Sequence, residues 1–165
     1  MQPWQPPSVG VVKVNWDAAI GSKVGWLRLG IIALNFQGHF MGAKCVMKRV
    51  VVDPKTAEAM AAFWAIQFCK EVGFFDVLFE GDAAQVVADI NSKISHLSKY
   101  GHFVESIRSE IQFSRLANFV HVHREANMAA HVLAKHAPIG KEDSCWLEDI
   151  PLCISHIVCW EQLFP

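Results

Sequence analysis

The stretch VKVNWDAA, residues 12–19, decides how the rest of this 165-residue sequence is interpreted. Its valines and Trp16 are β-prone and predict a strand. Alternation along that strand places Lys13, Asn15 and Asp17 on the face opposite the valines and Trp16. A lone carboxylate such as Asp17 is costly to bury in an apolar strand unless a partner or a metal ion accompanies it.

Two further acidic residues stand in equally apolar surroundings. Glu58 lies within AEA, residues 57–59, and Asp82 ends EGD, residues 80–82. Three such carboxylates in one small domain predict a shared site. Each of the two also has a local alternative. Glu58 would interact favourably with the helix dipole if it lay in a first helical turn, and Asp82 would serve as the N-cap of a helix over residues 83–90.

Apolar runs and capping signals predict the order of secondary structure. Residues 27–36 and 39–47 follow the first strand as two more antiparallel strands. Asp53 and Pro54 begin a helix, which ends at Gly73. The pattern then predicts a strand over 75–79, helices over 83–90 and 103–111, a strand over 119–122 and a core helix over 125–136. This order predicts an α/β fold whose five-stranded mixed sheet, a three-stranded antiparallel meander plus two parallel strands, is flanked by helices.

Composition indicates one packed domain. Hydrophobic residues make up 52% of the chain and the formal net charge is -1, so any nucleic-acid contact must be local. Residues 1–10 contain three prolines and predict an extended lead-in, residues 11–138 the domain, and residues 139–165 an apolar tail that packs on the domain or on a protein partner. The five cysteines include no Cys-x-x-Cys pair, which argues against a zinc knuckle. No apolar run approaches the ~20 residues of a membrane helix, and we expect an intracellular monomer.

Four pieces of sequence, taken in order, carry a resemblance to a known family. They are VKVNWDAA (12–19), AEAMA (57–61), FEGDA (79–83) and HREANMAAHVLAK (123–135). These pieces resemble the type I ribonuclease H family, and most of all its plant reverse-transcriptase-like branch, the ribonuclease H domain of non-LTR retroelements. The resemblance covers about residues 4–138 and implies a ribonuclease H-like fold.

The resemblance implies an activity and a metal site. The family cleaves the RNA strand of RNA/DNA hybrids by using two Mg²⁺ ions held by carboxylate oxygens. Asp17, Glu58 and Asp82 correspond to three of the ligands, and the fourth acid is replaced by His131. Because imidazole suits Mn²⁺ better than Mg²⁺, this substitution predicts weakened or Mn²⁺-preferring hydrolysis, or its loss. His121 corresponds to a loop histidine that assists proton transfer or product release.

Other positions bear on substrate binding. Ala18 and Ala83 replace a glycine and a serine that adjoin the family's first and third acids, which predicts reduced fit to the hybrid. Candidate polar contacts to the hybrid are Lys44, Lys48 and Arg49 on the meander and Arg124 with Asn127 at the last helix, although such residues are also common on solvated surfaces.

Several alternatives to this interpretation stay open. A zinc site formed by His121, His123 and His131 lacks an evident fourth ligand. A second hypothesis is a catalytically inactive descendant that binds nucleic acid or a protein. Neither hypothesis distinguishes the nucleus from the cytoplasm.

Overall fold

The computed structural model describes residues 3–21, 25–137 and 143–164 and contains one mixed sheet of six strands in the order β5-β4-β1-β2-β3-β6. Strands β1, β2 and β3 form an antiparallel meander, and β4 and β5 extend it in parallel with β1. The strands are β1 Val12–Ile20, β2 Trp26–Leu34, β3 Phe40–Arg49, β4 Asp76–Gly81, β5 Leu116–His121 and β6 Ser144–Trp146. The predicted meander and parallel strands are therefore confirmed.

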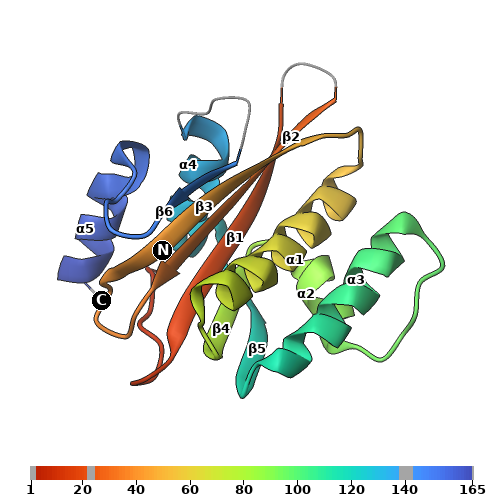
Figure 1. Cartoon of the computed structure of the whole chain (residues 1–165), viewed down its shortest axis with the longest axis horizontal. Coiled ribbons are helices and arrows are strands. Elements are labelled where there is room, and N and C mark those ends of the chain that lie inside the picture. Colours follow the sequence, from red (N-terminus) through yellow and green to blue (C-terminus); the bar gives the residue numbers. More distant parts are fainter. Residues whose placement is uncertain (1–2, 22–24, 138–142, 165) are drawn as a thin grey trace.

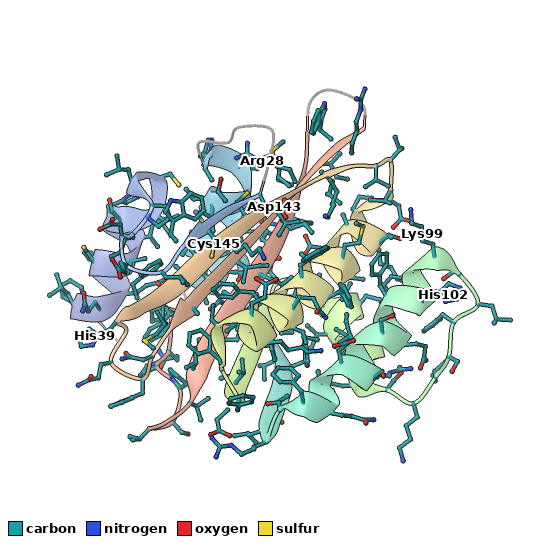
Figure 2. The ribbon with its side chains drawn as sticks, viewed as in Figure 1. Arg28, His39, Lys99, His102, Asp143 and Cys145 are labelled. Carbon is teal, nitrogen blue, oxygen red and sulfur yellow. The ribbon has the colours of Figure 1, made fainter. Side chains whose placement is uncertain are left out.

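The prediction of five strands is wrong by one. Residues 144–146 form β6, which pairs antiparallel with residues 43–45 of β3 at the edge of the sheet. Three residues are too few to show an alternating pattern, so the sequence did not reveal this strand. Figure 2 shows Asp143 and Cys145 on the segment that runs beside β3.

Helices cover both faces of the sheet (Figure 1). One face packs against α1, α2 and α3, and the other packs against α4 and α5. The helices are α1 Pro54–Val72, α2 Ala84–Asn91, α3 Lys99–Glu110, α4 Met128–His136 and α5 Ser155–Leu163. None of the described helices is long and apolar enough to cross a membrane.

Helix α1 has the predicted termini. The Asp53 side chain accepts a hydrogen bond of 2.8 Å from the backbone N–H of Thr56, and Pro54 occupies the first turn. The helix ends at Gly73, whose positive φ of 82° provides a left-handed C-cap. These two caps set where the helix begins and ends, and so place Glu58 in its second turn.

Both faces of β1 are buried because this strand lies at the centre of the sheet. Val14 and Trp16 belong to the core beneath α1–α3, whereas Lys13, Asn15 and Asp17 point to the opposite face and are also buried. Lys13 Nζ lies 2.8 Å from Glu80 Oε1, which neutralises one of these buried charges. The predicted division of the two faces is correct, but neither face is exposed to solvent.

Helix α4 lies directly against β2 because of Gly30. A Cβ atom at this position would lie 2.5 Å from the carbonyl oxygen of Ala130 and 2.6 Å from the backbone nitrogen of Ala134. Only glycine allows this close approach. The approach brings His131 of α4 to Asp17 of β1.

Candidate active site

Three acidic side chains from three separate elements meet at one edge of the sheet. Asp17 lies in the second half of β1, Glu58 lies on α1, and Asp82 directly follows β4. Because β1 and β4 are parallel neighbours, their carboxyl ends reach the same edge. Each side chain offers an oxygen atom within 4.8 Å of an oxygen of the other two. This cluster is the shared site that the three isolated acids predict.

Both local explanations for these acids are wrong. The first turn of α1 contains no acidic residue, so Glu58 lies too far along the helix to gain from its N-terminal dipole. The N-cap of α2 is Ala83, without a side-chain capping bond, so Asp82 does not cap that helix. The positions of Glu58 and Asp82 therefore need another explanation, which their mutual proximity provides.

The cluster concentrates negative charge at a site where Asp17 is buried and Glu58 and Asp82 are partly buried. Burial, together with the Asp17 and Asp82 carboxylates, raises the pKa of Glu58 to about 9. Burial and the charge on Asp82 also raise the pKa of Asp17. One oxygen of each residue, Asp17 Oδ1 and Glu58 Oε2, is buried without a hydrogen-bond partner. Two unpartnered oxygens beside a third carboxylate fit a divalent cation, which would supply the missing bonds and charge.

His131 and Arg124 close one side of the cluster. His131 Nδ1 lies 2.6 Å from Asp17 Oδ2, and the Arg124 guanidinium binds the Asp82 carboxylate through Nε. Arg124 Nη1 also lies 3.2 Å from the His131 ring. His131 therefore contacts one of the three acids but does not join the group whose atoms all lie within 4.8 Å of one another.

An open groove of about 540 Å³ lies in front of the cluster. It is lined by Glu58 and the start of α1, by Arg124 and His131, and by Ala18 and the residues that follow it on β1. The backbone N–H of Ala18 donates to Glu58 Oε1 at 3.3 Å. Ala18 therefore lines the groove directly beside Glu58.

Arg28 also lines this groove and was missed from the sequence. Its guanidinium donates to the carbonyl oxygens of Lys135 and Ala137 at 2.9 and 2.6 Å, at the C-terminal end of α4. A lone arginine in the otherwise apolar run of β2 was the available signal. Arg28 pairs with Ala19, which lies two residues beyond Asp17 on β1. A correct prediction of this strand register would have placed Arg28 near the site.

Asn127 lies near the site but is buried, with 1% of its surface exposed. Its amide donates to the Trp16 carbonyl oxygen at 2.9 Å, and its Oδ1 accepts from Asn15 at 3.0 Å. Asn127 thus holds the 3₁₀ turn over residues 124–127 against β1 and does not face the groove.

Lys44 lies away from the groove. Its Nζ is 2.6 Å from Glu71 near the C-terminal end of α1, whereas Glu58 lies in the second turn. Lys48 and Arg49 lie over the rings of Trp64 and Trp26, respectively. Ala83 directly follows Asp82 and is partly exposed.

His121 and His123 are exposed at the end of β5, with ring centroids 5.7 Å apart. His121 pairs with Gly81, which brings it next to the segment that carries Asp82. Within the described parts of the chain, the only group of three or more potential metal ligands is the acidic cluster. The zinc site of His121, His123 and His131 is therefore not formed.

Comparison with known proteins agrees with this architecture. Residues 15–137 match the family described as reverse transcriptase-like. The chain belongs to this family. It is 29% identical over 134 residues to an Arabidopsis thaliana protein named "Putative ribonuclease H protein At1g65750", an alignment that covers 81% of this chain and 22% of the relative. The chain thus spans about a fifth of that relative's length.

Solved ribonuclease H structures share the fold. RNase H1 from the archaeon Halobacterium salinarum superposes with a TM-score of 0.71 at 20% identity, covering 78% of this chain and 97% of the other. LC11-RNase H1, solved in complex with an RNA/DNA hybrid, gives a TM-score of 0.61 at 16% identity, covering 75% and 94%. The reverse transcriptase-like chain is a ribonuclease H-like domain of the plant type.

Proposed function

We propose that this domain is a metal-dependent endonuclease that hydrolyses the RNA strand of RNA/DNA hybrids. The observation that carries the proposal is the meeting of Asp17, Glu58 and Asp82 within 4.8 Å, with buried oxygens that no protein group satisfies. A protein gains no stability from this arrangement alone, because like charges repel and burial penalises each of them. The names of its relative and structural neighbours support the same substrate class.

Asp17, Glu58 and Asp82 are the proposed ligands of Mg²⁺ or Mn²⁺, and we keep the expectation of two ions with His131 as an additional ligand. Bound ions would activate the attacking water and stabilise the leaving oxygen. The donor set suits these ions, since all three acids offer oxygen atoms. His131 would offer an imidazole nitrogen in place of a fourth carboxylate, and this donor suits Mn²⁺ better than Mg²⁺.

The surrounding residues would bind and orient the hybrid. Arg124 carries a positive charge at the mouth of the groove and can contact a phosphate of the cleaved strand. Ala18 and Ala83 lie beside Asp17 and Asp82, where the nucleic-acid backbone would approach, and we keep the expectation that they reduce the fit to the hybrid. His121, beside Asp82, is the proposed group that moves a proton or helps the product leave.

The competing proposal is an inactive domain that binds nucleic acid or a protein. It is favoured by one specific observation, namely that His131 and Arg124 already bind carboxylate oxygens of Asp17 and Asp82. In this alternative, the Arg124 guanidinium neutralises Asp82 and the His131 ring satisfies an oxygen of Asp17 in place of metal ions. Both proposals agree with a protein of the nucleus or the cytoplasm, where nucleic acids are found.

Metal titration followed by thermal melting separates the two proposals. The native chain is expected to melt at a higher temperature in millimolar Mg²⁺ or Mn²⁺, because binding to the folded state alone stabilises it. Asp17→Asn should remove this shift, whereas Glu148→Gln, at an exposed position after β6, should retain it. The absence of a shift in the native chain with both metals would favour the inactive domain.

A further inference from the structure

A second cleft lies along a different face of α4 from the acidic groove. It has a volume of about 580 Å³ and lies between the N-terminal lead-in, α4 and α5. Its walls are mostly apolar and include the aromatic rings of Trp4, Trp160 and Phe164. Trp160 and Phe164 are 63% and 57% exposed, and their ring centroids lie 4.4 Å apart. These rings form an accessible aromatic wall.

Two buried polar groups in this cleft have unsatisfied atoms. Glu161 is 6% exposed and lines the cleft, yet its Oε2 has no hydrogen-bond partner. Trp4 is 3% exposed and also lines the cleft, and its indole Nε1 has no acceptor. A buried acceptor and a buried donor without partners are each costly, and the cost falls when a ligand satisfies them.

The ionisable residues around the cleft favour a ligand with a positive charge. The ionisable residues that line it are Glu125, Glu161 and His156, with no lysine or arginine among them. Lys13 Nζ lies 4.9 Å from the centroid of the Trp4 ring, but its direct contacts are Glu80 at 2.8 Å and the carbonyl oxygen of Gln5, so its charge offsets that of Glu161 only in part. Burial raises the pKa of Glu161 to about 7, so a cation in the cleft would favour its ionised form.

We propose that this cleft binds an arginine side chain presented by a basic segment of a protein partner. A guanidinium can stack on the rings of Trp160 and Phe164 while it donates to the Glu161 carboxylate, a combination that suits arginine better than lysine. The Trp4 indole N–H would donate to a peptide carbonyl oxygen of the same segment. The apolar walls from α4 and α5 would receive the neighbouring side chains.

The test uses NMR of the full ¹⁵N-labelled chain in EDTA, so that the acidic groove holds no metal ion. The probe is the peptide acetyl-Gly-Arg-Leu-amide, and its matched control replaces arginine by citrulline, which is uncharged and nearly isosteric. We expect saturable shifts of the Trp4 and Trp160 indole signals with the arginine peptide, and affinity about tenfold lower with citrulline. The signals of Trp26 and Trp64, which lie outside the cleft, should not move.

Substitutions test whether Glu161 binds the positive charge of the arginine peptide. Glu161→Gln should lower the affinity for the arginine peptide about tenfold. Asp17→Asn should leave the affinity unchanged, which separates this proposal from the nuclease proposal. Equal binding of the arginine and citrulline peptides to the native chain would overturn the inference, as would unchanged binding by Glu161→Gln. Shifts that depend on protein concentration without peptide would also overturn it, because a second copy would then occupy the cleft.

Discussion

Replacing Glu58 by glutamine should stabilise the metal-free domain. Burial and the acidic neighbours raise the pKa of Glu58 from 4.5 to about 9. Between these two pH values the folded state therefore keeps a proton on Glu58 that the unfolded state releases. This group's contribution to stability is therefore complete below pH 4.5 and is lost as the pH rises towards 9. The loss is ~1.4 kcal/mol per pH unit, or about 3 kcal/mol at pH 7. Since Asp17 titrates in contact with Glu58, this value is an upper bound.

Glutamine avoids that loss because it is neutral and keeps the acceptor for the Ala18 N–H. For a domain of this size, we expect Glu58→Gln to raise the melting temperature in EDTA at pH 7 by as much as about 6–12 °C. The gain should shrink at pH 5 and grow at pH 8. Glu148→Gln, at an exposed site, is the control and should change little at any pH. A Glu58→Gln protein that is no more stable than the native chain at pH 7, or whose difference does not vary with pH, would refute this reasoning.

Other substitutions test the parts of the structure that build the site. His131→Asp should increase the rate of hybrid cleavage in Mg²⁺, and equal rates for the two proteins would show that His131 is no defect. Gly30→Ala should lower the free energy of unfolding by about 1–3 kcal/mol in urea melts, because its Cβ would collide with α4. Asn127→Ala should cost about 1–3 kcal/mol in the same assay, since it removes the amide donor to the Trp16 carbonyl and leaves the Asn15 amide with Glu80 Oε2 as its remaining acceptor. Asp53→Ala should cost ~1 kcal/mol through loss of the N-cap of α1, and no loss would argue against the cap.

Local chemistry made most of the fold predictable. Asp53, Pro54 and Gly73 mark the two ends of α1 because capping depends on neighbouring residues alone. Strand β6 could not be predicted in this way, because its three residues are ordered by pairing with β3. The burial of both faces of β1 could not be predicted either, since it depends on helices that come much later in the chain.

The acidic cluster was predictable because buried carboxylates are rare and costly, and Asp17, Glu58 and Asp82 stand out against apolar neighbours. The start of the core helix predicted over residues 125–136 was wrong, because α4 begins at Met128. Residues 124–127 form a 3₁₀ turn, so α-helical spacing does not hold there, and Asn127 turns inward to β1. The position of Lys44 away from the groove could not be predicted, because it depends on an ion pair with Glu71, which is 27 residues away in sequence.

The most direct test of the central claim is cleavage of an RNA/DNA hybrid labelled on the RNA strand, in Mg²⁺ and separately in Mn²⁺. The account predicts that the native chain cuts the RNA strand with at least one metal, with higher activity in Mn²⁺, and that Asp17→Asn abolishes the activity. Single-stranded RNA and duplex DNA should stay intact. A native chain that is no more active than Asp17→Asn in both metals would contradict the proposal that the three acids form a working nuclease site.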